Sequence, residues 1–67
     1  MMTTDQMNAL RNAHWLLSCR FTSEMRRLEK ERPEMLVEEL RSDKHLSGRI
    51  LRAIKVMEEL YPELGND

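Results

Sequence analysis

The fold is decided by the stretch EKERPEM at residues 29–35, where Pro33 stands between two long segments of helix-forming residues. Proline lacks the amide hydrogen that a helix interior needs, and it disfavours helical backbone in the residue before it. It is well tolerated at the first position of a helix, and Glu34 then supplies the negative charge that a first turn favours. Residues 31–33 therefore predict a tight connection between two helical arms.

The arm before Pro33 carries one stripe of residues spaced three and four apart, which is the pattern of one face of an α-helix. The stripe consists of Met7, Leu10, His14, Leu17, Phe21, Met25 and Leu28. Thr3 and Gln6 have the spacing of a capping box, which closes the start of a helix. Because no glycine or proline interrupts this arm, the sequence predicts a single helix over about residues 4–31.

The arm after Pro33, over about residues 33–61, has strong helical periodicity at its two ends and weak periodicity between them. The middle segment SDKHLSG at residues 42–48 contains residues that favour helix N-caps, and it ends in a glycine. The arm is therefore either one helix bent near residues 43–48 or two helices with a break there, and a break should turn Leu46 inward. Pro62 should end the arm and leave residues 62–67 as a frayed tail.

Together the two arms predict an all-α protein built as an antiparallel helical hairpin. Pairing the arms about Pro33 places His14 beside Ile50 and Met7 beside Met57. A chain of 67 residues with one cysteine has no internal disulfide and no cysteine-based zinc site to support a small core. We therefore expect a homodimer that forms a helical bundle. The outline is similar to small helical hairpins that dimerise into four-helix bundles, although no shared motif carries the likeness.

A second apolar surface supports this expectation. Trp15 lies about 200° around the helix from Leu17, so it points away from the main stripe, and Leu16 and Cys19 flank it. Tryptophan is enriched at the buried centres of interfaces. We expect Trp15, Leu16 and Cys19 to form an oligomer or partner interface; the alternative is that Trp15 lies flat on the surface or packs under the second arm.

Residues 41–55 are rich in basic side chains, with Asp43 as the only acid. The residues expected to make polar contacts with a partner are Arg41, His45, Arg49 and Arg52. A short helix, a break and a basic helix also suggest a helix-turn-helix, but no small residue and glycine stand at the spacing that lets two such helices cross closely. The basic side chains of residues 41–55 still support an alternative function, that of a small dimeric nucleic-acid-binding protein.

Features of an enzyme are absent from the sequence. It has no glycine-rich phosphate loop, His14 and His45 are far apart, and Cys19 has no evident base partner. His14 lies on the apolar stripe, where a buried histidine with a hydrogen-bond partner is expected. We therefore predict a protein that is not an enzyme and that has no cofactor, no metal ion and no small-molecule substrate.

The length and net charge of the chain also favour a protein-binding role over an enzymatic or nucleic-acid-binding one. A chain of 67 residues excludes a fold with its own large active-site cleft, and a net charge of −1 argues against tight non-specific binding of nucleic acid by the whole chain. No signal peptide is apparent, and no uncharged stretch approaches the ~20 residues that span a membrane. The sequence predicts a cytoplasmic adaptor or regulator that binds a larger protein, such as a transcription regulator, without membrane association.

Overall fold

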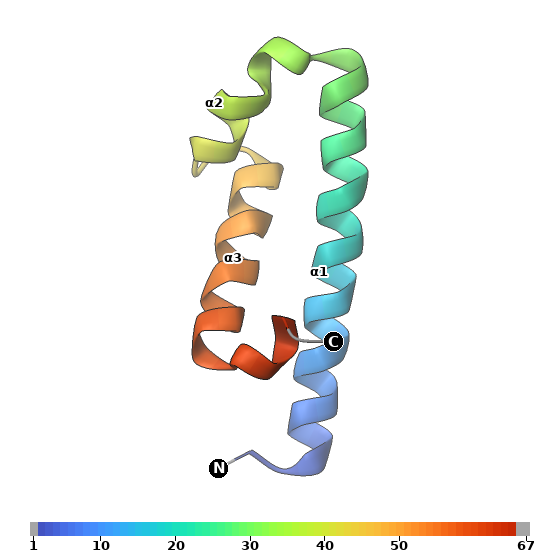
Figure 1. Ribbon diagram of the computed structural model, residues 1–67, viewed down its shortest axis with the longest axis vertical. Helices are drawn as coiled ribbons and strands as arrows, with labels where there is room; N and C mark the ends of the chain where they lie inside the picture. Colours follow the sequence, from blue (N-terminus) through green and yellow to red (C-terminus); the bar gives the residue numbers. More distant parts are fainter. Residues whose placement is uncertain (1, 66–67) are drawn as a thin grey trace.

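The computed structural model describes residues 2–65, and in this part of the chain all regular structure is helical. The elements are α1 (Thr4–Glu31), the 3-10 helix η1 (Pro33–Met35), α2 (Leu36–Arg41), α3 (Leu46–Leu60) and the 3-10 helix η2 (Pro62–Gly65). α1 runs the length of the molecule, and α3 packs beside it in the opposite direction (Figure 1). The all-α prediction is confirmed, and the packing of α1 on α3 is that of a helical hairpin about 43 Å long.

The ends of α1 lie where the sequence predicts them. The amide of Thr3 donates to the Gln6 side chain at 2.9 Å, and the amide of Gln6 donates to the Thr3 hydroxyl at 3.1 Å, which completes the capping box. At the other end, the amide of Arg32 donates to the carbonyl of Leu28 at 2.8 Å. Pro33 then occupies the first position of η1 rather than that of an α-helix.

The second arm is two helices with a break between them, the second of the two alternatives. α2 ends at Arg41, Ser42 has an extended backbone, and α3 begins at Leu46. The expectation that a break turns Leu46 inward is wrong, because Leu46 remains 45% exposed. Ser47 and Gly48 face the interior instead, and Ser47 is only 1% exposed.

Gly48 allows α3 to approach the end of α2 closely. A Cβ atom on Gly48 would lie 2.4 Å from the Ser42 carbonyl oxygen and 2.6 Å from the Glu39 carbonyl oxygen. No larger residue fits against this backbone without a shift of the chain. The expectation that no small residue and glycine stand at a spacing that lets the two helices cross closely is therefore wrong at Gly48.

The pairing of the two arms also differs from the simple register about Pro33. His14 contacts Glu58 rather than lying beside Ile50, a displacement of about two helical turns along α3. Residues 42–45 form a loop, so α3 starts beside the end of α2 instead of continuing from it (Figure 1). The break therefore consumes chain length without extending the arm.

The interior is small and includes both apolar and polar side chains. Within residues 2–65 the buried hydrophobic residues are Leu28, Ile50 and Leu64, and the buried polar residues are Glu24, Glu39 and Ser47. Leu64 is 4% exposed and belongs to η2, which packs on α3. The predicted frayed tail is therefore wrong for residues 62–65, while residues 66–67 lie outside the described part of the chain.

Candidate protein-interaction surfaces

The three residues predicted to form an interface are all exposed on α1. Trp15 is 64% exposed and Leu16 is 60% exposed, and the free thiol of Cys19 is also exposed. We call these three residues the Trp15 patch. The alternative in which Trp15 packs under the second arm does not hold, because most of its surface remains accessible.

A shallow groove separates the Trp15 patch from the end of the second arm. It is lined by Arg11, His14, Trp15, Ser18, Glu58, Leu64 and Gly65. His14 Nε2 lies 2.8 Å from Glu58 Oε2, and the His14 side chain is 14% exposed. The predicted hydrogen-bond partner of His14 is thus present, and the pair ties the first half of α1 to the last turns of α3.

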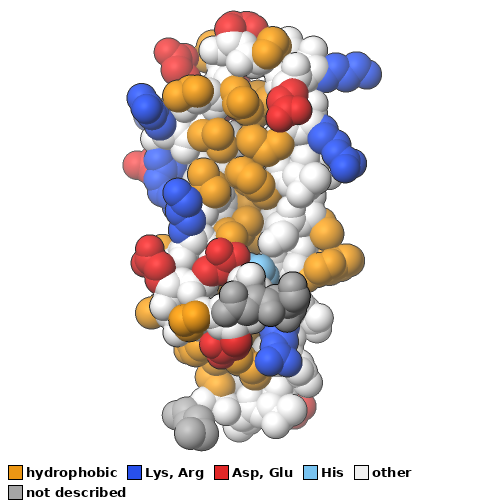
Figure 2. Space-filling view, viewed as in Figure 1, with side chains coloured by type: hydrophobic (Ala, Val, Ile, Leu, Met, Phe, Trp, Pro, Cys, Tyr) orange, Lys and Arg blue, Asp and Glu red, His pale blue; other side chains and the backbone are white. Residues whose placement is uncertain are grey.

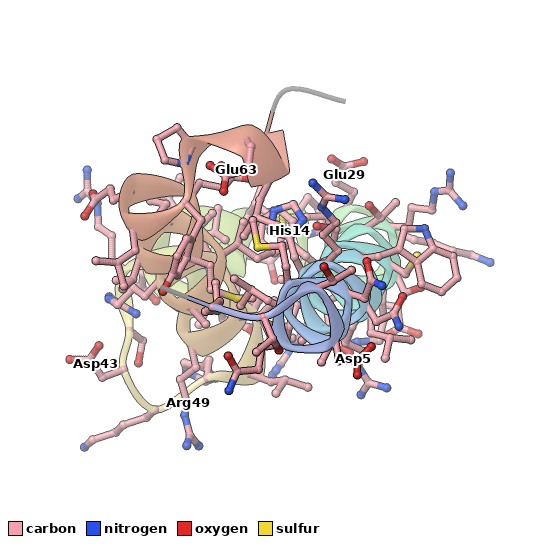
Figure 3. The ribbon with its side chains drawn as sticks, turned by 90° about the horizontal axis from the view of Figure 1, so that it is seen from below. Asp5, His14, Glu29, Asp43, Arg49 and Glu63 are labelled. Carbon is pink, nitrogen blue, oxygen red and sulfur yellow. The ribbon has the colours of Figure 1, made fainter. Side chains whose placement is uncertain are left out.

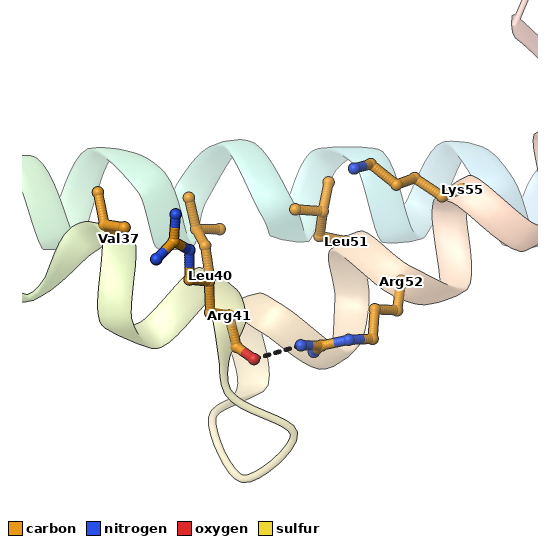
Figure 4. A pocket seen from close by; sticks show the side chains of 6 residues that line it. All are labelled: Val37, Leu40, Arg41, Leu51, Arg52 and Lys55. Atoms are coloured by element: carbon orange, nitrogen blue, oxygen red, sulfur yellow. Dashed lines mark hydrogen bonds between the residues drawn. The ribbon is translucent and has the colours of Figure 1, made fainter.

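A second groove lies on the second arm, where α2 and α3 meet. Its lining residues are Val37, Leu40, Arg41, Leu51, Arg52 and Lys55 (Figure 4). We call it the cationic groove. Val37 is 57% exposed, and Leu40 and Leu51 are half-buried, so its floor is apolar and accessible.

Arg52 is held at the rim of the cationic groove by the break between α2 and α3. Its guanidinium donates to the Ser42 carbonyl at 3.0 Å and to the Arg41 carbonyl, and it lies 3.1 Å from the Asp43 carboxylate. These contacts satisfy carbonyl groups that the end of α2 leaves without helical partners. Arg41 and Lys55, by contrast, form no ion pair within residues 2–65.

The four basic residues predicted to contact a partner do not form one surface. Arg41 and Arg52 line the cationic groove, whereas His45 lies 3.7 Å from the buried Glu39 carboxylate. Arg49 is exposed outside the groove, on the opposite side of the molecule from Glu63 (Figure 3). Lys55 was not among the predicted contact residues, and the apolar floor was not predicted; the spacing of Leu51 and Lys55, one helical turn apart, is the signal that could have linked them.

Charged side chains on the last turns of α1 neutralise one another. The Glu24 carboxylate is 3.3 Å from the Arg20 guanidinium and 2.9 Å from that of Arg27. The hydrogen bond and charge of Glu24 raise the pKa of Arg27 above its ordinary value. With the Arg27–Glu31 pair at 3.5 Å, this network links four charged side chains along one face of α1.

Within residues 2–65, no cluster of three or more histidine, cysteine, aspartate or glutamate side chains is arranged to hold a metal ion. In the same part of the chain, every helix is too short or too polar to cross a membrane. The exposed apolar side chains, many of them gathered on one face with Lys and Arg at its edges, are the more distinctive feature (Figure 2).

Comparison with protein-family models, curated proteins and solved structures found no match to this chain. Its function must therefore be inferred from its own residues and surfaces.

Proposed function

We propose that this chain is a small non-enzymatic interaction module, an adaptor or regulator that associates with a second copy of itself and binds a larger protein, such as a transcription regulator. The two roles use different surfaces. The Trp15 patch on α1 mediates self-association, and the second arm meets the larger protein. A cytoplasmic location fits this role.

The observation that carries the proposal is the exposure of Trp15 and Leu16, 64% and 60%, side by side on α1. Burying a large apolar side chain contributes about 1.5–3 kcal/mol, and tryptophan is enriched among the residues that dominate binding energy. A monomer gains none of this energy from the Trp15 patch. A second α1 packed against the patch covers it and extends the hairpin to a larger helical bundle.

The small interior also supports self-association. Only three hydrophobic residues among residues 2–65 are buried, and domains of this size usually need a disulfide, a metal or a partner to reach a stable fold. Cys19 is free. Additional apolar burial in a dimer supplies the stabilisation that the hairpin alone lacks.

The alternative function, binding of nucleic acid by residues 41–55, has less support. A phosphate-binding stripe needs several free basic side chains on one surface. Arg52 instead contacts the carbonyls of the break and Asp43, and Arg49 lies outside the groove that holds Arg41. Titration with a labelled DNA duplex separates the functions: a nucleic-acid binder loses affinity steeply with salt and on the combined change Arg49→Glu and Arg52→Glu.

Light scattering coupled to size-exclusion chromatography tests the self-association. We expect the mass of the wild-type chain to rise from 8.0 kDa toward twice that value as its concentration increases. Trp15→Asp should stay at 8.0 kDa while remaining helical by circular dichroism. Leu60→Asp, at an equally exposed leucine near the end of α3, is the matched control and should behave as wild type. A folded wild-type chain that stays monomeric at every concentration contradicts the proposal.

A further inference from the structure

We infer that the cationic groove binds an acidic amphipathic helix of a partner protein, an inference that rests on the proposed interaction function. It assigns the partner-binding role to Arg41, Lys55 and the apolar residues between them. Arg49 and His45, which the sequence also suggested, have no part in it.

The floor of the groove suits the apolar face of a helix. Val37 and Leu40 stand three residues apart on α2, and Leu51 continues the apolar surface on α3. Helices that dock into grooves present apolar anchors at intervals of three and four residues. Val37 is more than half exposed, so such an anchor reaches it without any rearrangement of the hairpin.

The charges around the floor define the chemistry of the partner. Figure 4 shows Leu40 and Leu51 between Arg41, which comes from α2, and Lys55, which comes from α3. Neither basic side chain has an ion-pair partner within residues 2–65. Carboxylates that flank the apolar face of a docking helix therefore meet Arg41 and Lys55. Arg52, whose charge is already paired with Asp43, lines the rim between them.

The Trp15 patch of a second copy is a poor match for the same groove. Residues 11–20 surround that patch with two arginines and contain no acidic residue. Placing them against Arg41 and Lys55 brings like charges together, which disfavours the contact. An acidic amphipathic helix from a different protein matches the groove in both respects: its apolar face fits the apolar floor, and its negative charges complement Arg41 and Lys55.

Two synthetic helical peptides test the inference. They share one stripe of leucines spaced three and four residues apart; one has glutamates on both sides of the stripe and the other has lysines. Fluorescence anisotropy should give an affinity for the glutamate peptide about tenfold or more above that for the lysine peptide, and this difference should shrink as salt increases. In NMR spectra of the labelled protein, the largest shifts should fall on residues that line the groove.

Variants of the groove have matched controls outside it. The combined change Arg41→Glu and Lys55→Glu should weaken binding of the glutamate peptide about tenfold or more, whereas Lys44→Glu with Arg49→Glu, the same change of charge at exposed positions outside the groove, should not. Val37→Asp should abolish binding while Val56→Asp, at a valine on α3 that is 51% exposed, should preserve it.

Several results overturn the inference. Absence of binding by the glutamate peptide does so, as do equal binding of both peptides and equal losses in the control variants. Shifts of groove resonances with protein concentration alone identify a second copy as the occupant, and preferential binding to phosphatidylglycerol vesicles identifies a lipid surface. Absent or equal peptide binding leaves the mass measurement on Trp15→Asp unaffected, so failure of the groove and failure of the proposed self-association are separate outcomes. A second copy in the groove would instead let the mass of Trp15→Asp rise with concentration.

Discussion

The two ends of the hairpin are built differently. At the end of the hairpin near Pro33, which we call the elbow end, the last turns of α1 pack against α2 and the start of α3. This end contains every buried residue in the described chain except Leu64. At the open end, the first half of α1 meets only the end of α3 and η2, and its first turns extend beyond them (Figure 1). The elbow end therefore contains most of the small core, whereas the open end contains Leu64 alone and leaves Trp15 and Leu16 uncovered.

The difference follows from how closely the backbones approach. At the elbow end, Gly48 brings α3 against the carbonyl oxygens of Ser42 and Glu39, and both Ser47 and Gly48 are buried there. At the open end, the link between α1 and α3 includes a polar pair, His14 and Glu58, whose carboxylate side chain is 40% exposed. Stability should consequently be concentrated at the elbow end, and the surface for self-association at the open end.

The largest effect that tests this comparison is expected from Leu28→Ala. Leu28 is fully buried at the elbow end, and truncation of such a leucine costs about 2–5 kcal/mol of unfolding free energy. Leu16→Ala, at an exposed leucine of the open end, should change the stability of the monomer by no more than about 0.5 kcal/mol. Urea denaturation at low protein concentration measures both, and equal losses would contradict the contrast between the two ends.

Gly48→Ala should be the next most disruptive change. Its new methyl group meets backbone oxygens at 2.4 and 2.6 Å, so we expect a loss of about 1–3 kcal/mol even though alanine is the better helix former. Gly65→Ala is the control, because its nearest contact is the flexible Glu58 side chain at 3.4 Å. Thermal unfolding that finds Gly48→Ala as stable as wild type would show that α2 and α3 do not cross as closely as described.

A smaller effect is expected for the polar link at the open end. A double-mutant cycle with His14→Ala and Glu58→Ala should give a coupling energy of about 0.5–1 kcal/mol, since the bond is only partly shielded from water. The exposed pair Arg27 and Glu31, at 3.5 Å, serves as a comparison and should couple more weakly. A coupling energy of zero between His14 and Glu58 would show that this pair does not link α1 to the end of α3.

Sequence reasoning predicted the long helix well because that helix depends on local signals. The Thr3–Gln6 capping box and Pro33 mark its two ends, and the apolar stripe identifies its inner face. These signals act within a few residues of one another, so they can be read directly from the sequence.

The second arm was harder to predict because its geometry depends on contacts between elements. The inward position of Ser47 and Gly48, in place of Leu46, follows from the crossing of α3 on α2, which no periodicity reveals. Pairing the arms by equal length failed for the same reason, since the loop at residues 42–45 shifts α3 relative to α1. The Trp15 patch was found because the helical position of Trp15 alone places it off the stripe, whereas the cationic groove needed the relative placement of two helices.

The central claim is that the open end is completed by a second chain, and hydrogen exchange at low and high protein concentration tests it most directly. We predict that the amides of α1 around Trp15 gain protection as the concentration rises, while those near Leu28 at the elbow end keep the same protection throughout. Protection around Trp15 that does not depend on concentration, in a chain that remains folded, would contradict the account.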